Sequence, residues 1–130
     1  MSEQTAEYRA WLAKAEGDWL CVQNEVSAAQ KPWDVIAFHC QQAAEKYLKS
    51  FLVSRGIRPA RTHDLARLLD ACAELDPALS TLRPACVKLS DFAVDVRYPD
   101  VAVEVEEQMA REAIETAERI CAAVRQRLPT

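Results

Sequence analysis

The sequence predicts an all-α fold, an up-and-down antiparallel helical bundle of four long helices plus a short third helix. Three observations support this fold: the segments between prolines are rich in strong helix formers, their apolar residues recur at intervals of three and four, and the connectors are short. At 130 residues, the chain fits a single domain over residues 1–130. The only glycines, Gly17 and Gly56, lie too far apart for a glycine-rich phosphate loop or a dinucleotide fingerprint.

The first two helices are expected at about residues 3–28 and 33–54. Lys31-Pro32 separates them, because the residue before a proline avoids helical geometry, and Pro32 suits the first turn of the second helix. Arg55-Gly56 then ends the second helix with a C-terminal glycine. The first helix presents one apolar stripe, formed by Trp11, Ala15, Trp19, Val22 and Val26. The second presents a broad arc expected to be buried, formed by Ile36, Cys40, Ala43, Ala44, Tyr47, Leu48 and Phe51.

Three further helices follow. Thr62 is expected as the N-cap of the third helix, which has Asp64 in its first turn and runs to about Leu75. A fourth helix carries apolar residues from Leu79 to Val96, and Pro84 either kinks it or marks its first turn. Residues 97–100 form a turn, and a long final helix with an inward apolar stripe reaches about position 128.

The cysteines predict neither disulfides nor a metal site. All five stand singly and far apart, without a CxxC pair, and each falls within an apolar helical pattern. The chain has two histidines and no Glu-x-x-His pair, so we expect no metal and no cofactor. No apolar run approaches the roughly 20 residues that a membrane span needs. We therefore expect a soluble protein of the reducing cytoplasm, with no membrane association.

The charge distribution is uneven. The formal net charge is −4, yet residues 31–67 hold seven Lys or Arg against three Asp or Glu. Such a basic centre could attract a phosphate or an RNA backbone. It could equally be a solvated face that meets an acidic partner, and the acidic composition favours this second interpretation because nonspecific nucleic-acid binders are usually basic overall.

A polar stripe on the second helix is a candidate binding surface. His39, Gln42 and Lys46 fall within about 60° around the helix axis, and Lys49 continues the stripe. Histidine can serve as an acid or base near neutral pH, glutamine offers a donor and an acceptor, and lysine attracts phosphate. The alternative is a histidine bonded to a neighbouring helix, with lysines that extend over the core.

Arg58 and His63 form an R-x4-H arrangement. An arginine that stabilises a phosphate in the transition state, near a histidine acting as acid or base, could cleave RNA without a metal. Alternatively, His63 packs or caps at the start of the third helix.

Three segments together resemble the HEPN domain family: FHCQQAAEKYLKSFL at 38–52, THDLARLL at 62–69 and RYPD at 97–100. Their order and spacing fit across nearly the whole chain. The resemblance implies a five-helix bundle that usually forms a homodimer. It also implies a partnership with a minimal nucleotidyltransferase, in a toxin–antitoxin-like pair.

The larger family includes metal-independent ribonucleases with an R-x4-6-H motif after the fourth helix. Arg97 stands where that arginine is expected, but positions 102–104 are Ala102, Val103 and Glu104. The motif therefore lacks the histidine that would transfer a proton. Whether the protein is an enzyme stays open, and a noncatalytic role is favoured.

Two functions are therefore expected. The favoured one is a noncatalytic nucleotide- or RNA-associated partner protein, and the alternative is a ribonuclease toxin that uses His39 or His63 in place of the missing histidine. The candidates for catalysis are Arg97 and His63. The candidate nucleotide or RNA contacts are His39, Gln42, Lys46, Lys49, Arg97 and Tyr98.

Overall fold

The computed structural model describes residues 2–92 and 104–129. Within these ranges the regular secondary structure is entirely helical, which confirms the all-α prediction. No helix in this part of the chain is long and apolar enough to cross a bilayer. The elements in chain order are α1 (Glu3–Ser27), α2 (Trp33–Ser54), α3 (Leu65–Leu75), the 3₁₀ helix η1 (Pro77–Leu82), α4 (Arg83–Ser90) and α5 (Glu107–Arg125).

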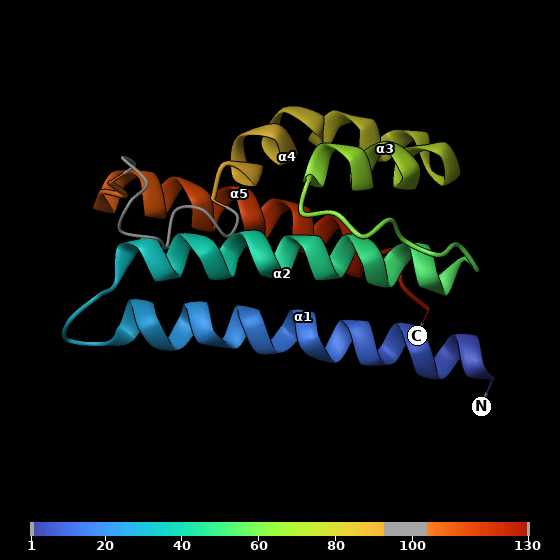
Figure 1. Ribbon diagram of the computed structural model, residues 1–130, viewed down its shortest axis with the longest axis horizontal. Helices are drawn as coiled ribbons and strands as arrows, with labels where there is room; N and C mark the ends of the chain where they lie inside the picture. The colour runs from blue at the N-terminus through green and yellow to red at the C-terminus, as the bar shows by residue number, and fades with distance from the viewer. Residues whose placement is uncertain (1, 93–103, 130) are drawn as a thin grey trace.

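Helix α2 lies at the centre of the bundle (Figure 1). It packs against α1 on one side and α5 on another, while α3 and α4 lie over the remaining side. Fifteen of its 22 residues are buried, against three of 25 in α1. The core of the domain is therefore built around α2, and α1, α5 and the pair formed by α3 and α4 each cover one side of it.

One connection departs from simple alternation of helix direction. Residues 55–64, here called the return segment, run back along α2, so that α3 begins beside the middle of α2 and follows the same direction (Figure 1). Two contacts mark this path: the Gln41 amide donates to the His63 carbonyl oxygen at 2.9 Å, and the Cys72 thiol contacts the Leu48 carbonyl at 3.6 Å. The return segment and α1 therefore lie on either side of α2, with part of the α2 surface between them.

The ends of α2 follow from local chemistry. Pro32 takes the N-cap, one position before the expected first turn, and its carbonyl accepts from the Ile36 amide. At the other end Gly56 has a φ of +79°, which a residue without Cβ adopts at little cost. The amide of Ile57 then donates to the Leu52 carbonyl, five residues back, which is the Schellman arrangement. The expected C-terminal glycine is confirmed.

The third and fourth helices begin differently from expectation. Asp64, and not Thr62, caps α3, because its carboxylate accepts from the amides of Ala66 and Arg67. The Thr62 hydroxyl instead accepts from the Asp64 amide. The expected fourth helix starts as η1 and becomes α-helical at Arg83, so Pro84 lies in the first turn of α4. Positions 93–96 of that expected helix lie outside the described residues.

The five cysteines are free thiols, as the sequence predicts. Burial raises the pKa of Cys40, Cys72 and Cys86 to about 12, and it also raises the pKa of Cys121. Cys21 on α1 is the half-buried exception. Within the described parts of the chain, no cluster of three His, Cys, Asp or Glu could hold a metal ion.

We expect a thiol reagent at mildly alkaline pH to label Cys21 alone in the folded protein. The four buried thiols are both inaccessible and protonated there, and the thiolate is the reactive form. Mass spectrometry of the native and the urea-denatured protein would count the labels. All five thiols should react after denaturation, and rapid native labelling of a second thiol would contradict this assignment.

Candidate functional site

His39 and Lys46, two members of the expected polar stripe, face α1. His39 Nδ1 lies 2.9 Å from Glu25 Oε1, and Lys46 Nζ lies 2.5 Å from Asp18 Oδ2. All four side chains are about four-fifths covered. Since both carboxylates belong to α1, these contacts give His39 and Lys46 a packing role between the two helices.

Lys49 and His63 meet on a single buried carboxylate. The Glu45 side chain is 4% exposed, and its Oε2 accepts from Lys49 Nζ at 3.1 Å. Its other oxygen, Oε1, lies 2.7 Å from His63 Nδ1. Because two partners share the carboxylate, its charge is compensated inside the protein.

The two nitrogens of His63 have different surroundings. The contact of Nδ1 with the Glu45 carboxylate favours the tautomer that carries its proton there, which leaves Nε2 as an acceptor. The side chain of His63 is 54% exposed, so the imidazole is accessible from solvent. A buried carboxylate thus orients an exposed imidazole, as in sites that transfer protons.

Two adjacent glutamines hold the return segment against α2. Gln41 is fully buried, and its amide donates to the His63 carbonyl oxygen at 2.9 Å. Gln42 donates to Gln41 Oε1 at 2.7 Å. Gln42, a candidate ligand contact, therefore supports the residue that positions His63.

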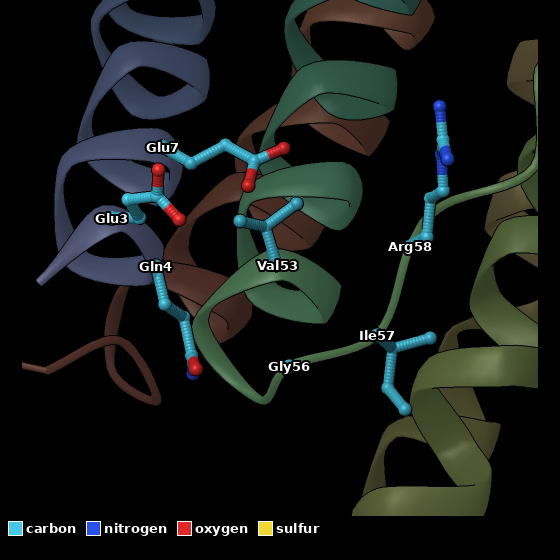
Figure 2. Close-up of a pocket in the computed structure, with 7 residues that line it drawn as sticks. All are labelled: Glu3, Gln4, Glu7, Val53, Gly56, Ile57 and Arg58. Carbon is cyan, nitrogen blue, oxygen red and sulfur yellow. The ribbon is translucent and has the colours of Figure 1, made fainter.

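A groove lies between α1 and the return segment. Its inner part, about 210 Å³, is lined by Glu7 and Trp11 on α1, Lys49 on α2, and Arg58, Pro59, Ala60 and Arg61 on the return segment. Its outer part, about 400 Å³, shares Glu7 and Arg58 with the inner part and extends to Gly56, at the end of α2 (Figure 2). In Figure 2 the carboxylates of Glu3 and Glu7 project from α1, across from Arg58.

The two walls of the groove carry opposite charge. Arg58 and Arg61 are exposed, and neither has an ion pair or hydrogen bond to any described residue. Lys49 Nζ lies 5.4 Å from the centroid of the Trp11 ring, a cation–π contact that places the indole at the groove. The α1 wall therefore combines carboxylates with an aromatic ring, and the opposite wall presents uncompensated guanidinium groups.

The structure brings together only part of the expected site. Lys49 and His63 meet through Glu45, whereas His39 and Lys46 contact Glu25 and Asp18, farther along α1. Arg97 and Tyr98 lie outside the described residues, so a cleft between them and α2 stays a prediction.

The sequence analysis did not single out four groove or cluster residues as functional: Glu7, Trp11, Glu45 and Arg61. The i,i+4 spacing of Glu45 and Lys49 was the available signal for their ion pair. Trp11, expected in the apolar stripe of the first helix, is half-buried at the groove.

Comparison with known proteins identifies the family. The sequence profile of the HEPN domain matches residues 8–127. The chain belongs to the HEPN domain family. This HEPN domain superposes on TT1696 from Thermus thermophilus with a TM-score of 0.82 and 28% identity, covering 93% of this chain and 98% of that one. It also resembles ST0689, an archaeal HEPN homologue, with a TM-score of 0.73 and 27% identity over 94% and 98% of the two chains. A comparison with curated proteins gives no match.

Proposed function

We propose that this HEPN domain is a noncatalytic nucleotide- or RNA-associated protein, and that it acts as the partner of a minimal nucleotidyltransferase in a toxin–antitoxin-like pair. The groove beside Lys49 carries the first part of the proposal, because it presents two guanidinium groups that have no carboxylate partner among the residues that the structure describes. Uncompensated arginines beside an aromatic ring suit a phosphate-bearing ligand. The family resemblance supports the partnership, and the free thiols suit the cytoplasm.

The noncatalytic assignment rests on two observations. Positions 102–104 hold no histidine, so Arg97 has no proton-transfer partner at the family's spacing. His39, one of the two replacements considered, has its Nδ1 at Glu25 and joins α2 to α1.

A double variant, Arg58→Ala with Arg61→Ala, tests the binding proposal. We expect it to weaken binding of nucleotides or short RNAs at low salt by more than about tenfold, because two charge-assisted contacts are lost. Arg67→Ala is the matched control, since Arg67 is an exposed arginine on α3 outside the groove. Lys46→Ala and Arg97→Ala test the remaining expected contacts. Isothermal titration that detects no ligand for the wild type at low salt would refute the proposal.

A metal-independent ribonuclease is the alternative, and the contact between His63 and Glu45 favours it. An exposed imidazole held by a buried carboxylate could accept a proton from a ribose 2′-hydroxyl. RNA cleavage by the purified protein in a chelator, lost in His63→Ala, would establish this activity and replace the noncatalytic assignment.

We also propose that the domain forms a homodimer. Leu20 on α1 is 55% exposed, and it lines a surface hollow whose other lining residues include Trp19, Glu16 and Arg125. An exposed apolar side chain rimmed by polar residues suits contact with a second copy of the chain. Light scattering at micromolar concentration should give twice the chain mass of 14.6 kDa. Leu20→Glu should shift the protein toward the monomer, whereas a wild type that stays monomeric would contradict the assignment.

A further inference from the structure

We propose that the groove between α1 and the return segment binds a ribonucleoside phosphate: the base against Trp11, the phosphate at Arg58 and Arg61, and the ribose hydroxyls at Glu7. The site rests on the proposed function and narrows it to one ligand class with assigned contacts. All four residues line its inner part, about 210 Å³, and its outer part, about 400 Å³, adds room beside Glu7 and Arg58.

The phosphate position follows from the distribution of charge. Lys49 also lines the groove, but its ammonium is paired with the buried Glu45 carboxylate. Arg58 and Arg61 have no such partner among the described residues, so they supply the uncompensated positive charge. The planar guanidinium fork matches phosphate oxygens in a bidentate manner. A phosphate is therefore drawn to the return segment and away from the acidic α1 wall.

The base position follows from Trp11. Its ring lines the inner groove, and the Lys49 ammonium helps to hold it there. The indole N–H of Trp11 has no hydrogen-bond partner among the described residues, so it can donate to a base or a hydroxyl. Stacking on an aromatic ring tolerates any base, because every base has a π-face. The groove therefore accepts ribonucleotides with little preference for the base.

The sugar position follows from Glu7, which lines both parts of the groove. A carboxylate accepts hydrogen bonds from the two vicinal hydroxyls of a ribose, whereas it repels a phosphate. Glu7 thus orients the ligand with its sugar toward α1. The 2′-hydroxyl is the group that distinguishes RNA from DNA, so Glu7 is expected to favour the ribose form.

Isothermal titration with four probes tests the assignment: AMP, 2′-deoxy-AMP, inorganic phosphate and a short RNA with a 5′-phosphate. We expect AMP to bind more tightly than 2′-deoxy-AMP and inorganic phosphate. Trp11→Leu and the double variant Arg58→Ala with Arg61→Ala should each weaken AMP binding by about tenfold or more. Glu7→Gln should reduce the preference for ribose over deoxyribose. RNA bound more tightly than AMP would identify the end of an RNA as the source of the nucleotide.

Matched variants distinguish the loss of a ligand contact from a loss of folding. Arg67→Ala, outside the groove, should bind AMP like the wild type, and Trp11→Phe should retain most of the affinity even if Trp11→Leu is poorly folded by circular dichroism. A wild type that binds neither AMP nor RNA would overturn both this site and the proposed function. Binding that is unchanged in Trp11→Leu, the double arginine variant and Glu7→Gln would overturn the site alone and leave the proposed function standing.

Discussion

Replacing Glu45 with alanine is expected to lower the free energy of unfolding by about 3–5 kcal/mol. The Lys49 side chain is only 9% exposed, and without Glu45 its largely buried ammonium would lose the carboxylate with which it is paired. His63 would also lose the contact at Nδ1 that orients its ring. Urea denaturation followed by circular dichroism measures the loss directly.

Two comparisons give this prediction its control. Glu45→Ala combined with Lys49→Met removes both charges, and it should recover much of the lost stability because no unpaired charge stays buried. Glu25→Ala breaks the more exposed pair with His39 and should cost about 1 kcal/mol or less. Equal losses for Glu45→Ala and Glu25→Ala would show that burial does not determine the strength of these contacts.

Phe51→Ala is expected to destabilise the domain by a similar amount, about 3–5 kcal/mol. Phe51 is fully buried on α2, so truncation leaves a cavity in the hydrophobic core that its neighbours fill only in part. Total stabilities of about 5–15 kcal/mol are typical, and the variant should therefore unfold at a much lower urea concentration.

Arg55→Ala is the matched control for Phe51→Ala. The Arg55 guanidinium lies 4.8 Å from the centroid of the Phe51 ring, so this variant removes the cation–π contact and leaves the ring in place. We expect a loss of about 1 kcal/mol or less, since Arg55 is exposed. If Arg55→Ala were as costly as Phe51→Ala, the ring would be stabilised by its cation–π contact and not by burial.

Helix boundaries could be predicted where one residue type dominates the local backbone. Pro32 and Gly56 flank α2, and its limits at positions 33 and 54 match the prediction. Thr62 and Asp64 can both cap a helix, so local preference did not discriminate between them. A tertiary contact positions the start of α3, because the Leu65 amide donates to the Ser90 hydroxyl of α4.

The candidate site was less predictable, because helical periodicity gives the side of a helix but not the neighbour that covers it. His39 and Lys46 were correctly grouped on one side of α2, yet the carboxylates that they contact come from α1. The sequence of residues 55–64 has no periodic pattern that would predict the path of the return segment. Without that path, the meeting of His63 with Glu45 and the position of Arg58 opposite α1 could not be derived.

The contrast in burial between α1 and α2 has a consequence for amide hydrogen exchange. Amides of α2 lie under all the other α-helices, so they exchange only when the whole domain unfolds. Helix α1 buries far less of its surface, and it can separate from α2 at a lower cost in free energy. One wall of the groove is therefore carried by an element that opens more readily than α2, and an occupant that bridges both walls would slow exchange in α1.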